Sequence, residues 1–192
     1  MEILFYHTAR VLSMESPETR KKDLCEFYHR LLCPRVAALV VALREDGKPN
    51  VMPVAWHTPV SVRPPILAVC ISPSRYTHSL ILKNKEFTVN IPDLSMKDAV
   101  EITGSKSGKV FDKSSIFKFT PATKVNTPLI DGALASIECE LNQAIDIGDH
   151  SVVFGNVVAC QASGFREVWK GTSPLLHLGS NFYTVIKEGF LR

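Results

Sequence analysis

An arginine with hydroxyl-bearing neighbours is the first group in the sequence that could do chemistry. Arg75 and Thr77 follow an apolar run, and Ser61 precedes that run. A guanidinium group presents a planar fork of N–H donors and each hydroxyl adds a neutral donor, so this combination suits an anionic ligand. Taken alone, however, Arg75 and Thr77 are better explained as residues that cap and solvate the helix after them.

A second polar segment, residues 104–108, resembles a phosphate-binding P-loop but departs from its pattern. Its two glycines are separated by three residues where the P-loop has four, and Val110 follows Lys109 where a Mg²⁺-binding hydroxyl is needed. The central Lys106 also excludes the serine nucleophile elbow of hydrolases. The segment is typical of a polar loop, in which Ser105 and Lys106 are candidates for contact with an anion.

The remaining titratable residues form no recognisable local site. The chain lacks the Rossmann glycine pattern, the commonest strand-turn-helix cradle for a dinucleotide. None of the six histidines stands at zinc-site spacing from another histidine or a cysteine. Their positions are His7, His29, His57, His78, His150 and His177. A metal centre or a Cys–His pair built from distant parts of the chain is not excluded by spacing, but no local pattern supports either.

Composition predicts one folded domain that spans residues 1–192. The chain is 45% hydrophobic, and its net charge of +3 is too small to indicate a nucleic-acid partner. The five cysteines form no CxxC pair, the opening residues lack the pattern of a signal peptide, and no apolar run approaches membrane-spanning length. We therefore expect free thiols, no membrane partner and a cytoplasmic location.

Apolar periodicity predicts a mainly β chain with a few peripheral helices. Strands are expected at residues 36–43, 50–57, 66–71, 87–91, 133–142, 151–160, 175–178 and 182–186, and helices at 19–32, 76–82 and 92–100. Residues 104–127 are expected to be mostly loop. Because strands and helices do not alternate regularly, an antiparallel barrel is favoured over a parallel sheet. Residues 1–34 are expected to form a helical segment that packs on the barrel.

Several short motifs follow one another in a recognisable order, most of them within residues 50–90. They are Asn50, Pro53-Val54-Ala55-Trp56, Pro59-Val60-Ser61, Pro64-Pro65, the strand from Ala68 to Ser72, Arg75 with Thr77, Glu86-Phe87-Thr88-Val89-Asn90, Thr103-Gly104-Ser105-Lys106-Ser107-Gly108, and Gly148-Asp149-His150 with Gly155. Each motif is weak alone, but their shared order gives them weight. Over residues 36–183 the chain resembles the flavin reductase-like family, in particular its flavoredoxin branch.

This resemblance implies an FMN-binding split β-barrel, a Greek-key antiparallel barrel with peripheral helices that normally forms a homodimer with the flavin near the subunit interface. Without a glycine-rich helix start, the FMN phosphate is expected to be held by Arg75, Ser61 and Thr77. Strand ends are expected to provide an apolar slot and backbone groups for the ring. The residues implied to bind the cofactor are Pro53, Val54, Ala55, Trp56, Ser61, Cys70, Ile71, Ser72, Arg75, Thr77, Asn90, Ser105 and Lys106.

Structural roles without cofactor contact are the alternative for several of these residues. Trp56 could pack in the core or at a subunit interface, and Cys70 is favoured as a small buried residue over a redox thiol. Ser105 and Lys106 could belong to an ordinary loop. The resemblance also places His150 beside the flavin, where it would position the nicotinamide of NAD(P)H, and the alternative is a polar hairpin turn.

Two departures from the family pattern concern the pocket. Ser114 follows Asp112-Lys113 where the family has phenylalanine, and His57 follows Trp56 where many relatives carry a smaller residue. Both departures are expected to affect substrate preference more than FMN binding.

The implied function is an FMN-dependent oxidoreductase that passes electrons from NAD(P)H through FMN to a soluble acceptor. Free flavin, a ferric complex or a redox protein could serve as that acceptor. The alternative is an electron-transfer flavoprotein with tightly bound FMN and no NAD(P)H turnover. A third, less favoured, interpretation is a split barrel that binds another ligand such as haem.

Overall fold

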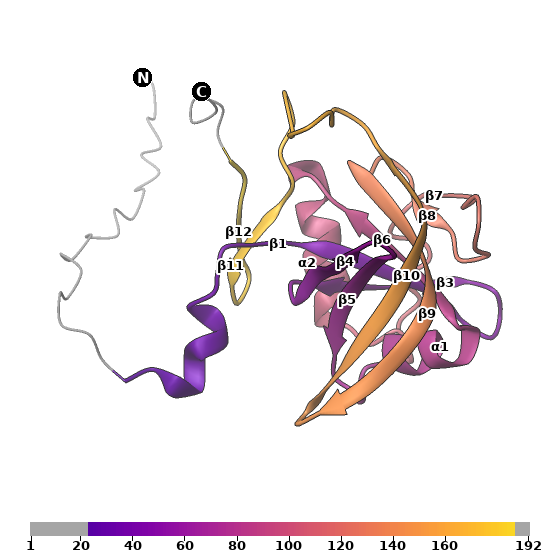
Figure 1. Cartoon of the computed structure of the whole chain (residues 1–192), viewed down its shortest axis with the longest axis horizontal. Helices are drawn as coiled ribbons and strands as arrows, with labels where there is room; N and C mark the ends of the chain where they lie inside the picture. Colours follow the sequence, from indigo (N-terminus) through magenta and orange to yellow (C-terminus); the bar gives the residue numbers. More distant parts are fainter. Residues whose placement is uncertain (1–22, 187–192) are drawn as a thin grey trace, which may run out of the picture.

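A curled seven-stranded sheet forms the body of the molecule in the computed structural model, which describes residues 23–186 (Figure 1). Its strands are β2 (Ala38–Leu43), β3 (Pro49–Val54), β4 (His57–Val62), β5 (Pro65–Ile71), β6 (Glu86–Ile91), β9 (Ala135–Ile147) and β10 (His150–Ala162). They lie in the spatial order β3-β2-β6-β9-β10-β5-β4, and each neighbouring pair is antiparallel. The expected mainly β, antiparallel fold is therefore confirmed.

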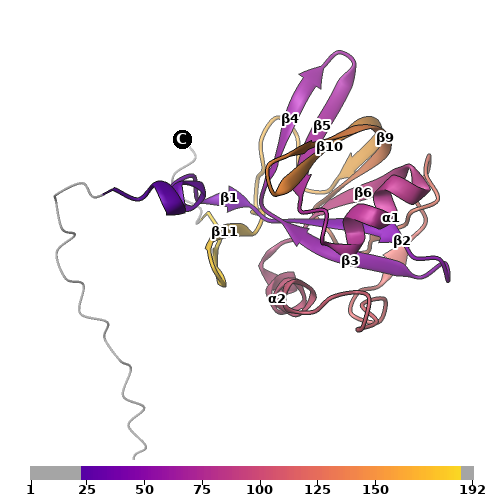
Figure 2. The same cartoon turned by 90° about the horizontal axis from the view of Figure 1, so that it is seen from below.

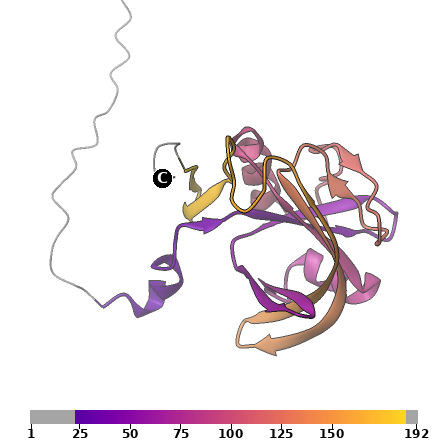
Figure 3. The ribbon, with the colours of Figure 1, turned by 45° about the horizontal axis from the view of Figure 1, so that its top comes forward.

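The two edge strands explain why the sheet curls. β3 and β4 lie at opposite edges, although only Ala55 and Trp56 separate them in sequence. Because three peptide units reach at most about 11 Å, the two edges must approach each other until the sheet nearly closes. Cys70 of β5 donates its N–H to the carbonyl oxygen of Trp56 at 2.8 Å within this seam. Figure 3 shows the strands wrapped around a common interior, as expected of a split barrel.

The apolar patterning of the strands accounts for the interior. β2 is buried over its first five residues because both of its faces are covered, one by a cluster that includes Phe87 and the other by a cluster that includes Val100 and Leu175. A bulge in β9 lies opposite Gly155 of β10, where an added Cβ would lie 2.6 Å from the Cζ atom of Phe87. The strands expected at 133–142 and 151–160 are present within β9 and β10. Both observed strands extend further than expected, and together they form one hairpin.

Short helices cover the sheet. α1 (Tyr76–Asn84) packs on β2 and β6, and the 3₁₀ helix η2 (Leu94–Met96) leads into α2 (Lys97–Ser105), which packs on β3. The helix expected at 92–100 begins later because the Asp93 side chain accepts from the Ser95 N–H and caps η2 first. The strand expected at 50–57 ends at Val54, and β4 follows as a separate strand. Pro59 is tolerated in β4 because that strand lies at the edge of the sheet.

A polar loop connects α2 to β9 and is held by a buried carboxylate. It contains only the two-residue strands β7 (Phe119–Thr120) and β8 (Leu129–Ile130), which pair with each other. Glu138 of β9 is 2% exposed and accepts hydrogen bonds from Thr123 N and Oγ1, Lys124 N and Val125 N. These hydrogen bonds attach the loop to the sheet.

A small sheet stands beside the barrel and carries the N-terminal 3₁₀ helix η1 (Cys25–Arg30) (Figure 2). It consists of β1 (Arg35–Val36), β11 (Leu176–Gly179) and β12 (Phe182–Thr184). Of the segment expected to be helical, residues 1–22 lie outside the described residues, and η1 has no buried residue. Apolar side chains in η1 and directly after it, such as Phe27 and Leu31, are exposed, and the packing of residues 1–34 on the barrel stays a prediction. Within residues 23–186, no helix has the length and apolar character needed to cross a membrane.

Candidate functional site

Two adjoining cavities lie along β3 and share Pro53 and Gly104 in their walls. The larger, here called the large cavity, has a volume of about 580 Å³ and lies between the end of β3, α2 and the β11–β12 hairpin. The smaller, here called the cationic cavity, has a volume of about 270 Å³ and lies between β3, the start of α1 and the loop after α2. Together they form a continuous site with two chemically different parts.

The cationic cavity gathers three basic side chains and no carboxylate among its lining residues. The basic residues are Arg75, Lys106 and Lys113, and hydroxyls come from Ser74, Thr77 and Ser107. α1 begins at Tyr76 beside the same cavity without a side-chain cap, so its first N–H groups add partial positive charge. This donor set suits an anion with several oxygen atoms, such as a phosphate monoester.

Lys113 is the least expected member of this group. It is 4% exposed, and its Nζ donates to the carbonyl oxygens of Val51 at 2.9 Å and Thr103 at 2.7 Å. Burial lowers the pKa of Lys113 to about 8, and the positive charge of Arg75 acts in the same direction. A buried ammonium group held only by neutral carbonyl oxygens is costly, and an anionic ligand would offset that cost.

A close contact between Asn50 and Gly108 shapes the inner wall of the cationic cavity. Asn50 is 2% exposed and donates from Nδ2 to Thr77 Oγ1 at 2.8 Å, while its Oδ1 has no hydrogen-bond partner in the described part of the chain. A Cβ added at Gly108 would lie 1.8 Å from that Oδ1, so only glycine fits there. The segment that fails as a P-loop therefore serves as a wall, and it covers a buried acceptor that has no partner among the described residues.

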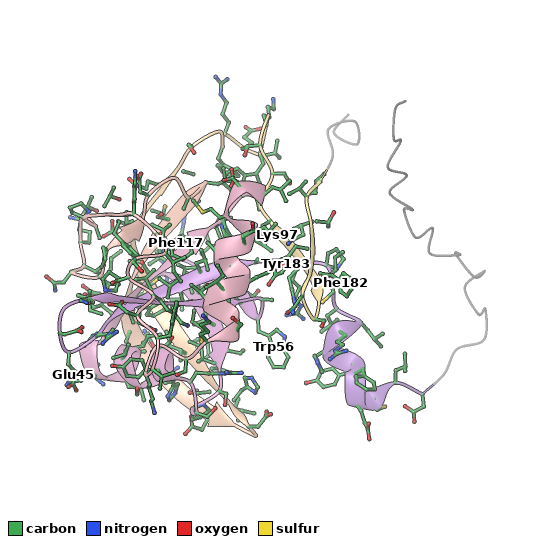
Figure 4. The ribbon with its side chains drawn as sticks, turned by 180° about the vertical axis from the view of Figure 1, so that it is seen from behind. Glu45, Trp56, Lys97, Phe117, Phe182 and Tyr183 are labelled. Carbon is green, nitrogen blue, oxygen red and sulfur yellow. The ribbon has the colours of Figure 1, made fainter. Side chains whose placement is uncertain are left out.

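The large cavity is lined by backbone and small side chains on one side and by polar side chains on the other. Pro53, Val54 and Ala55 provide the first wall. The facing residues are Glu101, Ile102, Gly104 and Ser105 of α2 and His177, Ser180, Asn181 and Tyr183 of the C-terminal hairpin. Figure 4 shows Tyr183 next to Lys97 beside α2, with Trp56 farther along the same side. A flat ring with polar edge atoms would meet backbone groups on one side and hydrogen-bonding side chains on the other.

Aromatic rings meet at the seam next to the large cavity. The Trp56 ring lies 4.8 Å from the His150 ring and 5.6 Å from the His29 ring, measured between ring centroids. His150 Nδ1 is 2.8 Å from Asp149 Oδ1, and this contact lowers the pKa of the Asp149 carboxyl group. His150 thus lies at the rim of the barrel, oriented by a carboxylate and stacked on the residue that follows Ala55.

The structure brings together most of the residues that the sequence analysis selected. Pro53, Val54, Ala55 and Ser105 line the large cavity, and Arg75, Thr77 and Lys106 line the cationic cavity. Ser72 is linked to the latter because its Oγ lies 2.9 Å from Ser74 Oγ. Trp56 and His150 lie together at the rim. Cys70 is half-buried in the seam, and burial raises the pKa of its thiol, in agreement with the role of a small buried residue.

Three other selected residues lie outside the linings of both cavities, and their contact with a cofactor stays a prediction. Asn90 is fully buried, and its Oδ1 accepts from Ile130 N and Ser136 Oγ, so its amide is used to hold the fold. Ile71 is 1% exposed because alternation along β5 turns it into the core. Ser61 lines a separate apolar groove of about 430 Å³ and does not meet Arg75.

Two residues that line the cavities, Lys113 and Tyr183, are not indicated by the sequence. Nothing in the sequence around Lys113 indicates that this lysine is buried, because it follows Asp112 in a polar stretch. Tyr183 belongs to a short strand whose position opposite α2 depends on the tertiary fold. Across residues 23–186, no three His, Cys, Asp or Glu side chains are placed to hold a metal ion. All five cysteines lie in this range and are free thiols.

Comparison with known proteins gives the family. The family model described as flavin reductase like domain matches residues 29–185. An uncharacterized protein of Pyrococcus abyssi is 39% identical over 148 residues, which are 77% of this chain and 84% of that protein. A flavin reductase (NADH) of Kitasatospora aureofaciens is 30% identical over 128 residues, which are 66% of this chain and 65% of that protein.

Solved structures give the same result. An FMN-binding protein from Thermus thermophilus with bound 1-cyclohex-2-enone superposes with a TM-score of 0.79 at 32% identity, over 90% of this chain and 97% of that chain. A flavoredoxin from Methanosarcina acetivorans superposes with a TM-score of 0.72 at 26% identity, over 81% of this chain and 87% of that chain. The motifs, the curled sheet and these matches agree, and the chain belongs to the flavin reductase-like family of split-barrel proteins.

Proposed function

We propose that this chain binds FMN with its phosphate in the cationic cavity and its ring in the large cavity, and that it passes electrons from NAD(P)H to a soluble acceptor. The observation that carries this proposal is the contrast between the two joined cavities. One has three basic residues and no carboxylate among its lining residues, and the other is wide and mostly neutral. A ligand that combines a phosphate with a flat ring matches both parts in one orientation.

The residues have distinct tasks in this proposal. Arg75, Lys106 and Lys113 would bind the phosphate with the help of the Thr77 hydroxyl, and the unpartnered Oδ1 of Asn50 would accept from a ribityl hydroxyl. Backbone groups of the β3 end would orient the ring and exclude water from one of its faces. Bound FMN supplies the capacity for hydride and electron transfer, for which the chain itself needs no acid, base or nucleophile.

His150 is proposed to position the nicotinamide of NAD(P)H. Its contacts with Trp56 and Asp149 hold the imidazole at the rim, where one ring nitrogen faces the carboxylate and the other stays available. The name of the Kitasatospora relative, a flavin reductase (NADH), supports a nicotinamide reductant.

The acceptor is proposed to be free flavin, a ferric complex, a redox protein or a small carbonyl compound. The last class is included because the Thermus protein was solved with 1-cyclohex-2-enone. A second candidate function is electron transfer with tightly bound FMN and no NAD(P)H turnover, and the likeness to a flavoredoxin favours it. Steady-state oxidation of NAD(P)H by the FMN-loaded protein separates the two functions, because only the first predicts turnover.

We also propose a homodimer in the cytoplasm. The exposed apolar side chains of η1 and its flanks, Leu24, Phe27, Tyr28, Leu31 and Leu32, form a surface that a second copy would cover. Free thiols at all five cysteines suit a reducing compartment. Light scattering of the FMN-loaded protein should give twice the 21.3 kDa chain mass, and a monomer would refute the dimer.

Titration of the purified protein with FMN tests the central proposal. Stoichiometric binding with quenched flavin fluorescence is expected, and the same titration with haem tests the third interpretation of the sequence. Absence of FMN binding by calorimetry at micromolar concentrations would refute the assignment of both cavities.

A further inference from the structure

The charge of the large cavity comes from one acidic residue. Among the described residues that line this cavity, Glu101 is the only acidic side chain and none is lysine or arginine, and Glu101 lies on the α2 wall. Lys97 Nζ lies 2.8 Å from Glu101 Oε1 and 3.8 Å from Asp98 Oδ1, so one lysine is shared by two carboxylates. Among the described lining residues, the large cavity therefore carries one carboxylate and no lysine or arginine, whereas the cationic cavity carries three basic side chains and no carboxylate.

Tyr183 and His177 of the β11–β12 hairpin line the same cavity and carry hydrogen-bonding groups. The Tyr183 hydroxyl makes no hydrogen bond to any residue within 23–186, although the side chain is half-buried. Burial, and then the charge of Glu101, raises the pKa of Tyr183, so its hydroxyl stays a donor at neutral pH. His177 Nε2 meets the Ser180 carbonyl oxygen at 2.8 Å and must be the donor, and its Nδ1 has no hydrogen-bond partner on the described chain.

We propose that the part of the large cavity between the bound flavin ring and Tyr183 selects an uncharged ligand with a carbonyl oxygen, which accepts from the Tyr183 hydroxyl, and that Glu101 excludes carboxylates and other anions. This inference rests on the proposed function and names the substrate class of the same site. It separates uncharged carbonyl compounds from the anionic members of the acceptors considered above, such as ferric complexes with carboxylate ligands.

The size of the exclusion follows from Coulomb's law. Two like charges about 7 Å apart repel by an amount that depends on an effective dielectric between about 20 and 80, and Lys97 offsets part of the charge of Glu101. We therefore expect the carboxylate member of a matched ligand pair to bind about three- to tenfold more weakly than it would without Glu101.

Two ligands of nearly equal shape test this selection. At pH 7, 4-hydroxybenzamide is uncharged and 4-hydroxybenzoate is an anion, and both carry an oxygen that can accept from Tyr183. Their dissociation constants are measured by calorimetry with the oxidised, FMN-loaded protein and no reductant, so that binding and not turnover is recorded. The wild-type protein is expected to prefer the amide.

Variants of one helix provide a matched comparison. Glu101→Gln should strengthen benzoate binding about three- to tenfold and narrow the preference for the amide. Asp98→Asn removes the same charge beside the same lysine, but Asp98 has a 92% exposed side chain and does not line the cavity, so it should change the ratio less than twofold. Tyr183→Phe should weaken amide binding severalfold.

Each outcome decides the inference. Equal effects of Glu101→Gln and Asp98→Asn, equal binding of both ligands by the wild-type protein, or binding of neither ligand would overturn it. FMN titration of every variant keeps this result apart from the proposed function. Failure of the wild-type protein to bind FMN refutes that function, whereas normal FMN binding with unchanged ligand selection refutes only the inference.

Discussion

FMN affinity should fall above pH 8 because Lys113 then loses its charge. In the ligand-free protein, burial lowers the pKa of Lys113 to about 8, with a further contribution from Arg75. A phosphate dianion beside the ammonium group favours the charged form and returns the pKa towards its ordinary range. FMN binding therefore takes up a proton above pH 8, and the affinity decreases as the pH rises.

The magnitude follows from the fraction of Lys113 that is charged. At pH 9 only about one tenth of this lysine is protonated in the ligand-free protein, so FMN should bind about tenfold more weakly than at pH 7. The shift from the ordinary value of 10.5 corresponds to about 3 kcal/mol, which is the most that a phosphate could recover. In the ligand-free protein, the unfolded chain binds more protons between pH 8 and 10.5, so the free energy of unfolding should rise with pH there.

Riboflavin provides the control because it shares the flavin ring but lacks the phosphate. The dissociation constants of both ligands are measured by fluorescence quenching at pH 7, 8 and 9, and their ratio removes any effect of ring ionisation. The wild-type ratio should change about tenfold between pH 7 and 9, and Lys113→Met should make it independent of pH. A constant wild-type ratio, or the same slope in the variant, would refute the role of Lys113.

Four further variants test separate parts of the structure. Arg75→Ala should weaken FMN binding about tenfold or more while riboflavin binding changes little, since a charge-assisted hydrogen bond contributes roughly 1.5–3 kcal/mol; equal losses in calorimetry would make Arg75 structural. Gly108→Ala should lower the free energy of unfolding in denaturant by about 1–3 kcal/mol and weaken FMN binding, because its Cβ collides with Asn50; an unchanged variant would contradict the close contact. Burial alone would raise the pKa of Glu138, but its hydrogen bonds outweigh that effect and lower the pKa. Glu138→Gln should therefore cost about 1.5–3 kcal/mol at pH 7, and the difference from wild type should shrink as the pH falls below about 4.5 and the wild-type carboxylate is protonated; a cost that does not depend on pH would show that its charge is not involved. His150→Ala should slow reduction of bound flavin by NAD(P)H several-fold in stopped-flow measurements, and an unchanged rate would return His150 to the role of a turn residue.

Much of the fold could be predicted from the sequence because most strands have a local pattern of apolar residues. The apolar run of β2, the alternating residues of β9 and the nearly continuous apolar run of β10 are each recognised from local sequence. β4 was missed because Pro59 and polar residues disguise an edge strand, and the start of α2 was misplaced because Asp93 caps a shorter helix first. These errors concern places where one side-chain contact decides between two structures.

The candidate site was predictable only in part. Arg75, Thr77 and the end of β3 belong to motifs with a recognisable order, and they line the two cavities. Lys113 could not be selected, because its burial depends on carbonyl oxygens contributed by Val51 and Thr103 from other elements. Asn90 was selected because it lies within a family motif, and motif membership does not distinguish a residue that binds a ligand from one that holds the sheet together.

The two-residue connection through Ala55 and Trp56 has a consequence for how the protein unfolds. Because β3 and β4 flank the whole sheet, the seam between them exists only when all seven strands are in place. Residues at this seam line the large cavity, so the cavity is absent from a partly unfolded barrel. A ligand held there stabilises the complete native state over every partly open form, by an amount that grows with its concentration. A ligand that stays bound during denaturation would therefore show that the entire barrel is still closed. Its release would coincide with the detachment of the first strand from the sheet.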